Sequence, residues 1–258
     1  MRGTRTTTTR LGICVAGALL VLTGAAVLPG GDAATAAPAA CALPQGKQRL
    51  ALDPADFTTT IDNPWWPMRP GSRWVYRETA PDGTVQRVVV TVLASTKLIA
   101  NGITARVVRD VVTEDGKPVE VTADWYAQDR CGNVWYLGED TKDYENGKVV
   151  STKGSFEAGV DGAQAGVAVP ANPRPGMRYR QEYYAGHAED RAEVVSLREQ
   201  VEVPFGYFRR GRVLMTRDLN PLDAKVLEYK FYVRGLGMVL AVGVSGGADR
   251  EELVRYTR

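Results

Sequence analysis

The stretch Asp124-Trp-Tyr-Ala-Gln-Asp-Arg-Cys-Gly-Asn-Val-Trp-Tyr-Leu-Gly-Glu-Asp140 decides the fold of this chain. At its start, Trp125 and Tyr126 point to opposite sides, and a period of two with aromatic residues is typical of a half-buried β-strand. Residues 129–133 include Asp, Gly and Asn, which tolerate the left-handed backbone of a tight turn. Residues 134–136, Val-Trp-Tyr, favour a second strand. No apolar face recurs at three and four residues, so the stretch predicts a β-hairpin.

A similar hairpin is predicted in residues 228–240, where Phe231 stands 106 residues after Trp125. The segment Arg69-Pro-Gly also recurs as Arg174-Pro-Gly, at an offset of 105. Landmarks that keep nearly one offset indicate an internal duplication. Arg-Pro-Gly is also a common way to start a turn, and β-hairpins resemble one another, so chance similarity is the alternative. We predict two repeats, residues 69–140 and 174–243.

Residues 1–36 have the features of an export signal peptide. Arginines at positions 2, 5 and 10 precede an apolar stretch at residues 11–28, and Ala34-Thr-Ala36 is a candidate cleavage site. Two alternatives stay open: the 18 apolar residues form a retained anchor, or Ala39-Ala-Cys41 acts as a lipobox in which Cys41 carries a lipid. We therefore predict a secreted or cell-envelope protein that associates with a membrane only if Cys41 is lipidated.

The cysteines fit an oxidising compartment. Cys14 leaves with the signal peptide, and the remaining pair, Cys41 and Cys131, is predicted to form a disulfide. Closing a loop of about 90 residues stabilises the fold by up to roughly 4–5 kcal/mol in the chain-entropy model. Two cysteines without a neighbouring histidine do not predict a zinc site. A lipidated Cys41 would be unable to form the bridge.

The charge of the processed chain excludes one class of partner. The signal peptide holds three of the 32 basic residues and one of the 30 acidic residues, which leaves 29 of each. No block of lysine and arginine remains that would follow a phosphate backbone. We therefore expect no nucleic-acid partner.

The rest of the sequence predicts one all-β domain. Residues 37–68 form an irregular, proline-rich lead-in, and its two tryptophans either plug an opening of the sheet or form an exposed platform for sugars. Residues 69–258 alternate between strand patterns and Asp-Gly or Asn-Gly turns, which predicts sequential antiparallel pairing. The Gly/Ala/Pro-rich residues 157–173 are expected to link the repeats or to form a flap. The predicted architecture is a strongly curved antiparallel sheet or barrel built from the two repeats.

Several segments together resemble a family of exported bacterial proteins known mainly as hypothetical proteins. They are Asp124-Trp-Tyr-Ala-Gln-Asp with Gly-Asn-Val-Trp-Tyr136, Gly159-Val-Asp-Gly-Ala163, Tyr179-Arg-Gln-Glu-Tyr-Tyr184 with Ala188-Glu-Asp190, and Glu228-Tyr-Lys-Phe-Tyr232. The chain departs from that family's usual Ala-Pro-Gly-Val-Gly at residues 233–237. The resemblance implies no activity. The pattern is also loosely similar to β-sheet carriers of the LolA lipoprotein type, which is an analogy of fold alone.

Few residues point to catalysis. The only histidine, His187, is flanked by acidic residues, but a turn residue in solvent is the simpler interpretation. Neither a nucleophile elbow nor a phosphate loop or dinucleotide fingerprint is present, so we expect no cofactor and no metal. Glu139 and Asp140 lie beside aromatic residues, and a pair of carboxylates is what a glycosidase needs. A carbohydrate-active hydrolase is therefore the alternative function.

The leading hypothesis is an exported, non-catalytic protein that binds an apolar or lipid-like ligand. Aromatic residues on strand faces are expected to line its concave surface: Trp74, Tyr76, Trp125 and Phe231. A filled core without a cavity, in a purely structural envelope protein, stays open as a further alternative.

Overall fold

The structure is a computed structural model that describes residues 41–258. The predicted signal peptide, residues 1–36, lies outside this range. The described chain contains a 3₁₀ turn, η2 (Pro54–Asp56), and strands throughout. The strands are β1 (Phe57–Thr58), β2 (Arg73–Thr79), β3 (Val85–Leu98), β4 (Thr104–Glu114), β5 (Lys117–Asp129), β6 (Val134–Glu145), β7 (Lys148–Ser151), β8 (Phe156–Glu157), β9 (Gln164–Val169), β10 (Arg178–Arg180), β11 (Glu182–Tyr183), β12 (Arg191–Val203), β13 (Gly206–Leu219), β14 (Leu227–Val233), β15 (Gly237–Ser245) and β16 (Arg250–Thr257).

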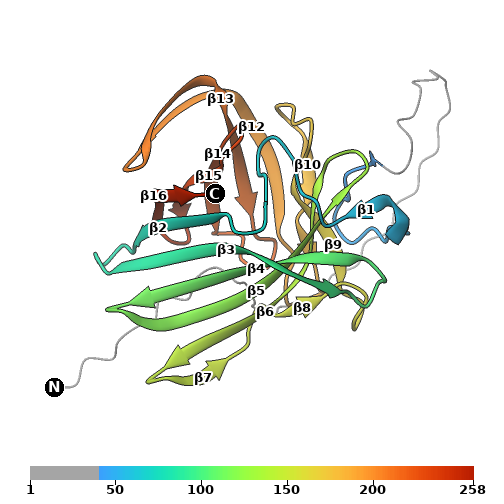
Figure 1. Cartoon of the computed structure of the whole chain (residues 1–258), viewed down its shortest axis with the longest axis horizontal. Coiled ribbons are helices and arrows are strands. Elements are labelled where there is room, and N and C mark those ends of the chain that lie inside the picture. Colours follow the sequence, from blue (N-terminus) through green and yellow to red (C-terminus); the bar gives the residue numbers. More distant parts are fainter. Residues whose placement is uncertain (1–40) are drawn as a thin grey trace.

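These strands form one antiparallel sheet that curls until it is nearly a closed barrel (Figure 1). The order is β10-β12-β13-β14-β15-β16-β2-β3-β4-β5-β6-β9-β11. The first strand of this path approaches the last but one, where Arg180 Nη2, on β10, donates a hydrogen bond of 2.7 Å to the carbonyl of Ala165, on β9. The predicted fold class, an all-β, antiparallel and strongly curved sheet, is confirmed.

Turn chemistry explains the sequential pairing. Asp115 and Gly116 join β4 to β5 with φ of 50° and 77°, and Asn146 and Gly147 join β6 to β7 with φ of 52° and 75°. Two consecutive residues with positive φ match the twist of antiparallel strands, and Asp-Gly and Asn-Gly adopt this conformation at low cost. The hairpins therefore form where the sequence predicts them.

The order of strands is the same in both predicted repeats. In residues 69–140, β2, β3, β4, β5 and β6 are neighbours in chain order, and β10, β12, β13, β14 and β15 are neighbours in the second half. β16 joins the first group to the second by pairing with β15 and β2. This recurrence is compatible with a duplication, which stays a prediction.

The segment expected to be a linker or flap contains a strand. β9 (Gln164–Val169) pairs with β6 and with β11, and its Val167 and Val169 are fully buried. Gly166 passes so close to the next segment that a Cβ there would lie 2.3 Å from the backbone of Gln181. The small residues of this segment thus serve close strand packing, and β9 is part of the sheet.

The lead-in packs its two tryptophans against the core. Trp65 is 5% exposed, and the ring of Trp66 lies 5.5 Å from Tyr126 and 5.9 Å from Tyr232. Asn63 stabilises the Trp65 turn, because its Oδ1 accepts a hydrogen bond of 2.8 Å from the Trp65 amide. Both rings pack against the core, which agrees better with a plug than with an exposed platform for sugars. That they close an opening of the sheet stays a prediction. Within residues 41–258, no helix has the length and apolarity needed to cross a membrane.

The structure joins the two cysteines of the described chain. Cys41 and Cys131 form a disulfide with their Cα atoms 5.8 Å apart, a separation typical of such bridges. Cys131 follows Asp129, whose carboxylate accepts hydrogen bonds from the amides of Cys131 and Asn133. The bridge ties the start of the described chain to the turn between β5 and β6.

Candidate functional site

Cross-strand register gathers carboxylates on one face of the sheet. Val108 on β4 lies opposite Asp124 on β5, which in turn lies opposite Glu139 on β6. Directly opposed residues share a face, and Val108 belongs to the main buried core together with Tyr76 and Leu253. Asp124 and Glu139 therefore point to the enclosed side of the curled sheet. We call this side the inner face.

A tyrosine bridges these two carboxylates. The hydroxyl of Tyr136 lies 2.6 Å from Glu139 Oε2 and 2.9 Å from Asp124 Oδ1. Because a phenol has one proton, it can donate to only one of them. The other carboxyl completes a hydrogen bond only when it is protonated and donates to the tyrosine oxygen. The geometry thus requires a proton shared within the group.

The electrostatics agree with a retained proton. Burial raises the pKa of Glu139 to about 7. The hydrogen bond from Tyr136 lowers this pKa and repulsion from Glu120 raises it, but both effects are smaller than that of burial. Burial and the neighbouring Glu139 raise the pKa of Asp124 well above its ordinary value. Burial and Asp190 do the same to the pKa of Glu182 on β11. Removing carboxylates from water and placing them side by side disfavours their ionised forms.

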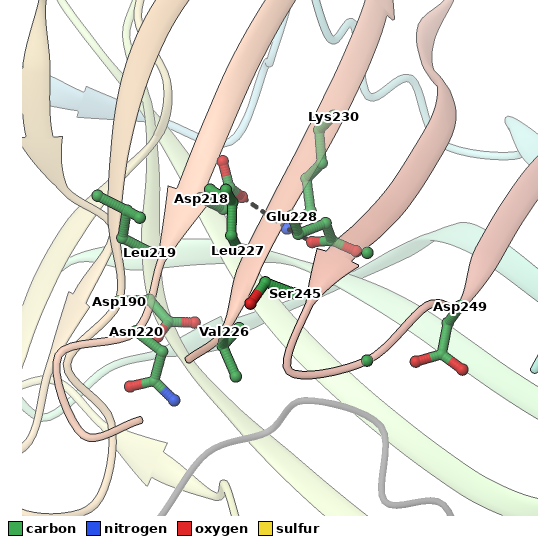
Figure 2. Close-up of a pocket in the computed structure, with 12 residues that line it drawn as sticks. Asp190, Asp218, Leu219, Asn220, Val226, Leu227, Glu228, Lys230, Ser245 and Asp249 are labelled. Carbon is green, nitrogen blue, oxygen red and sulfur yellow. Dashed lines mark ion pairs between the residues drawn. The ribbon is translucent and has the colours of Figure 1, made fainter. Parts of the chain in front are cut away.

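A lysine on another strand lies close to these carboxyl groups. Lys230 on β14 lies 2.7 Å from Asp218 on β13 and 3.1 Å from Glu228 (Figure 2). Burial alone would lower the pKa of Lys230, but the two carboxylates outweigh it and raise that pKa well above its ordinary value. Burial raises the pKa of the nearby Asp190 to about 8, against the attraction of Lys230. The lysine is therefore charged and compensated, while Asp190 is mostly neutral at pH 7.

This lysine and its partners line an open pocket (Figure 2). The pocket has a cavity volume of about 60 Å³ and opens to solvent. Acidic and polar groups share its wall with aliphatic ones: Asp190, Asp218, Glu228, Lys230, Asn220, Ser245, Asp249, Leu219, Val226 and Leu227. The pocket can receive a small polar head group with a short apolar part beside it.

Two polar atoms near the pocket lack hydrogen-bond partners. Asp190 Oδ1, in the pocket wall, is buried and unpartnered within the described chain. The hydroxyl of Tyr179 is likewise unpartnered, although Tyr179 is only 2% exposed. Asp218 lies close enough to raise the pKa of Tyr179, after the larger effect of burial. A buried polar atom without a partner costs free energy, so these atoms favour a bound group or solvent molecule here.

The four aromatic residues predicted to line a ligand surface are not gathered in this pocket. Trp74 and Tyr76 are 1% and 2% exposed, and they donate hydrogen bonds to the carbonyls of Leu236 and Met238. They fill the core of the inner face, against which Phe231 also packs.

Trp125 occupies a different place. It alternates with Asp124 and Tyr126 along β5, so it lies on the other face and belongs to a second buried cluster. Lys97 Nζ lies 3.6 Å from the centre of its ring. The expected single surface of Trp74, Tyr76, Trp125 and Phe231 is therefore divided between two clusters. That these residues bind a ligand stays a prediction.

The predicted pair Glu139 and Asp140 is also separated. Consecutive residues of a strand point to opposite faces, and Asp140 is half exposed with Lys142 as its ion-pair partner. The carboxylate that approaches Glu139 is Asp124. Cross-strand counting from the hairpin would have found this pair, because a two-stranded register places Asp124 opposite Glu139.

His187 lies in an exposed turn, where its ring stacks on Tyr184 at 4.4 Å. No three histidine, cysteine or acidic side chains come together in a metal-binding arrangement in the part of the chain that the structure describes.

Lys230, Asp190 and Asp218 were not predicted as site residues. The pattern Glu228-Tyr-Lys-Phe-Tyr232 carried a usable signal, since it places Glu228 and Lys230 on one face of β14. Asp190 and Asp218 come from other elements, and only the folded register brings them to that face.

Comparisons with known proteins find distant similarity in structure alone. No family model matches the sequence, and no curated protein matches it. A candidate lipoprotein from Parabacteroides distasonis aligns with a TM-score of 0.41 and 12% identity, over 75% of this chain and 98% of that one. A β-barrel-like protein of the domain of unknown function DUF1849, from Brucella abortus, aligns with a TM-score of 0.34 and 13% identity, over 73% of this chain and 98% of that one. Similarity this low supports no conclusion about the present chain.

Proposed function

We propose that this is a non-catalytic, extracytoplasmic binding protein. Its ligand is an apolar or lipid-like molecule that carries an amine head group, and the head group occupies the pocket beside Lys230. The observation that carries the proposal is the composition of the pocket wall. The wall holds four carboxyl groups against one lysine, and Leu219, Val226 and Leu227 supply an aliphatic side. The carboxyl groups belong to Asp190, Asp218, Glu228 and Asp249.

The charges of the pocket wall and the protonation of Asp190 favour an amine over other head groups. Lys230 already pairs with Asp218 and Glu228, so a carboxylate or phosphate ligand would compete with them and meet their repulsion. Asp190 keeps an unpartnered oxygen and a pKa of about 8. An ammonium group beside it would favour its ionised form. Binding would thus release the proton of Asp190 near neutral pH.

Catalysis by the carboxylate pair of the inner face is the weaker interpretation. A retaining glycosidase needs one ionised carboxylate as its nucleophile and one protonated carboxyl as its acid. Burial raises the pKa of both Asp124 and Glu139, and repulsion from Glu139 raises that of Asp124 further. Both groups contact Tyr136. These contacts favour a structural role for the pair.

The test is a calorimetric titration of the protein with octylamine, octanol and octanoate at pH 7. We expect the amine to bind most tightly and octanoate least. Repeating the amine titration in buffers of different ionisation enthalpy should reveal proton release. Asp190→Asn should abolish that release, whereas Asp140→Asn, which removes an exposed carboxylate elsewhere, should leave it unchanged. Equal binding of the three compounds, or no binding, would exclude the proposed ligand class.

A further inference from the structure

The β12–β13 hairpin carries an unusual insertion of arginines. Glu199 lies opposite Val213, but the next aligned pair is Val201 with Phe208. A single residue of β12, Gln200, therefore faces the four residues Arg209-Arg-Gly-Arg212 of β13. Gly211 has φ of +84°, and all four residues of this bulge are exposed. The bulge places three exposed arginines within four residues.

Two further arginines extend this basic surface. The amide of Arg234 donates a hydrogen bond of 3.0 Å to the carbonyl of Arg212. Arg198 directly precedes Glu199, which pairs with Val213, the first residue after the bulge. Arg198 and Arg234 are both exposed. In the described chain, none of the five arginines forms an ion pair with a carboxylate. We call Arg198, Arg209, Arg210, Arg212 and Arg234 the arginine surface.

Exposed aromatic residues stand beside the arginine surface. Phe205 and Tyr207, at the tip of the same hairpin, are 39% and 58% exposed. The hairpin itself is anchored, because Val201 and Val203 belong to the main core and the Phe205 amide donates to the carbonyl of Leu253 at 3.0 Å. Figure 1 shows this hairpin curving over at the top of the view, with its tip bent back toward β16. The tip of the hairpin is therefore held in place, and it exposes two aromatic rings beside the arginine surface.

We propose that this hairpin docks on a lipid bilayer that contains anionic phospholipids. Guanidinium groups bind phosphate oxygens in pairs of hydrogen bonds, and anionic surfaces attract clustered cations. Aromatic side chains with apolar bodies enter the interfacial region of a bilayer. Five arginines against Glu199 and Glu202 give the hairpin region a local charge of about +3. The compact patch with two protruding rings fits a membrane surface better than the long basic track that a nucleic acid requires.

The experiment measures how much of the processed protein sediments together with lipid vesicles. Mass spectrometry first establishes that residues 1–36 are absent. One set of vesicles contains phosphatidylglycerol in phosphatidylcholine, and the other contains phosphatidylcholine alone. The test variant carries Arg209→Gln, Arg210→Gln and Arg212→Gln. The control variant loses the same charge at exposed positions of β3, β4 and β7, with Arg87→Gln, Arg109→Gln and Lys148→Gln.

The protein and the control variant should bind the anionic vesicles much more strongly than the neutral ones. Their binding to the anionic vesicles should weaken as the salt concentration rises. Each arginine beside an anionic surface contributes roughly fivefold to partitioning, so the test variant should bind roughly a hundredfold more weakly. Phe205→Ser with Tyr207→Ser should reduce the binding that persists at high salt. Equal binding by the test and control variants, or stronger binding of the protein to single-stranded DNA than to anionic vesicles, would overturn the proposal.

Discussion

The tyrosine-bridged carboxylates make stability depend on pH in a direction opposite to that of most ion-paired acids. Glu139 has a pKa of about 7 in the folded protein against an ordinary 4.5. The folded state therefore binds more protons than the unfolded state between these values, and the free energy of unfolding falls as pH rises through them. The pKa of Glu139 is raised by about 2.5, and a difference of one in pKa corresponds to about 1.36 kcal/mol. The free energy of unfolding should therefore fall by about 3 kcal/mol as the pH rises to 8.

Glu139→Gln removes this cost. Glutamine keeps an oxygen that accepts the hydrogen bond from Tyr136, and it never ionises. We expect the variant to match the parent protein near pH 5 and to be more stable by about 2–3 kcal/mol at pH 8, measured by urea denaturation. Infrared difference spectra between the two proteins at pH 6 should show the carbonyl band of one protonated carboxylic acid that the parent has and the variant lacks, while the band of protonated Asp190 is common to both and cancels.

Asp140→Asn is the matched control for this experiment. Asp140 is the next residue in the strand, but it faces solvent and pairs with Lys142, so its neutralisation should change stability by less than about 1 kcal/mol at either pH. The account would be refuted if Glu139→Gln lowered stability at pH 8, or if both variants gave the same pH profile.

Three other substitutions follow from the packing. Replacing Cys41 and Cys131 with alanine should lower the free energy of unfolding by about 2–5 kcal/mol under oxidising conditions, and reductant should have little further effect on the variant. Lys230→Met should destabilise the protein by about 1–3 kcal/mol at pH 8, because the buried Asp218 and the half-buried Glu228 lose their ion-pair partner, and a denaturant titration at that pH measures it. Gly166→Ala should speed hydrogen exchange in β9 and β11, since its Cβ would meet the backbone of Gln181 at 2.3 Å, and unchanged exchange would contradict the close approach at this seam.

The sequence predicted local structure well where the signal was local. Alternation around Trp125 gave the central hairpin, and the pairs Asp115-Gly116 and Asn146-Gly147 gave two turns that the structure contains. Such features depend on residues within a few positions of one another, which is why the class of the fold was predictable.

Features that depend on distant strands were not predictable in the same way. β9 lies in a Gly- and Ala-rich segment, and it becomes a strand by pairing with β6 and β11. Alternation showed that Trp74 and Trp125 each point to one side of a strand, but it gave no information on which sides coincide. The pocket residues Asp190, Asp218 and Lys230 meet through the register of β12, β13 and β14, and this register contains bulges.

The most direct test of the proposed function is an NMR titration of the ¹⁵N-labelled protein with octylamine. The account predicts that amide shifts change with saturation at Asp190, in residues 218–230 and in residues 243–249, and that Asp190→Asn weakens these changes. Shifts centred on Trp74 and Tyr76, or no saturable change at all, would contradict a ligand site beside Lys230.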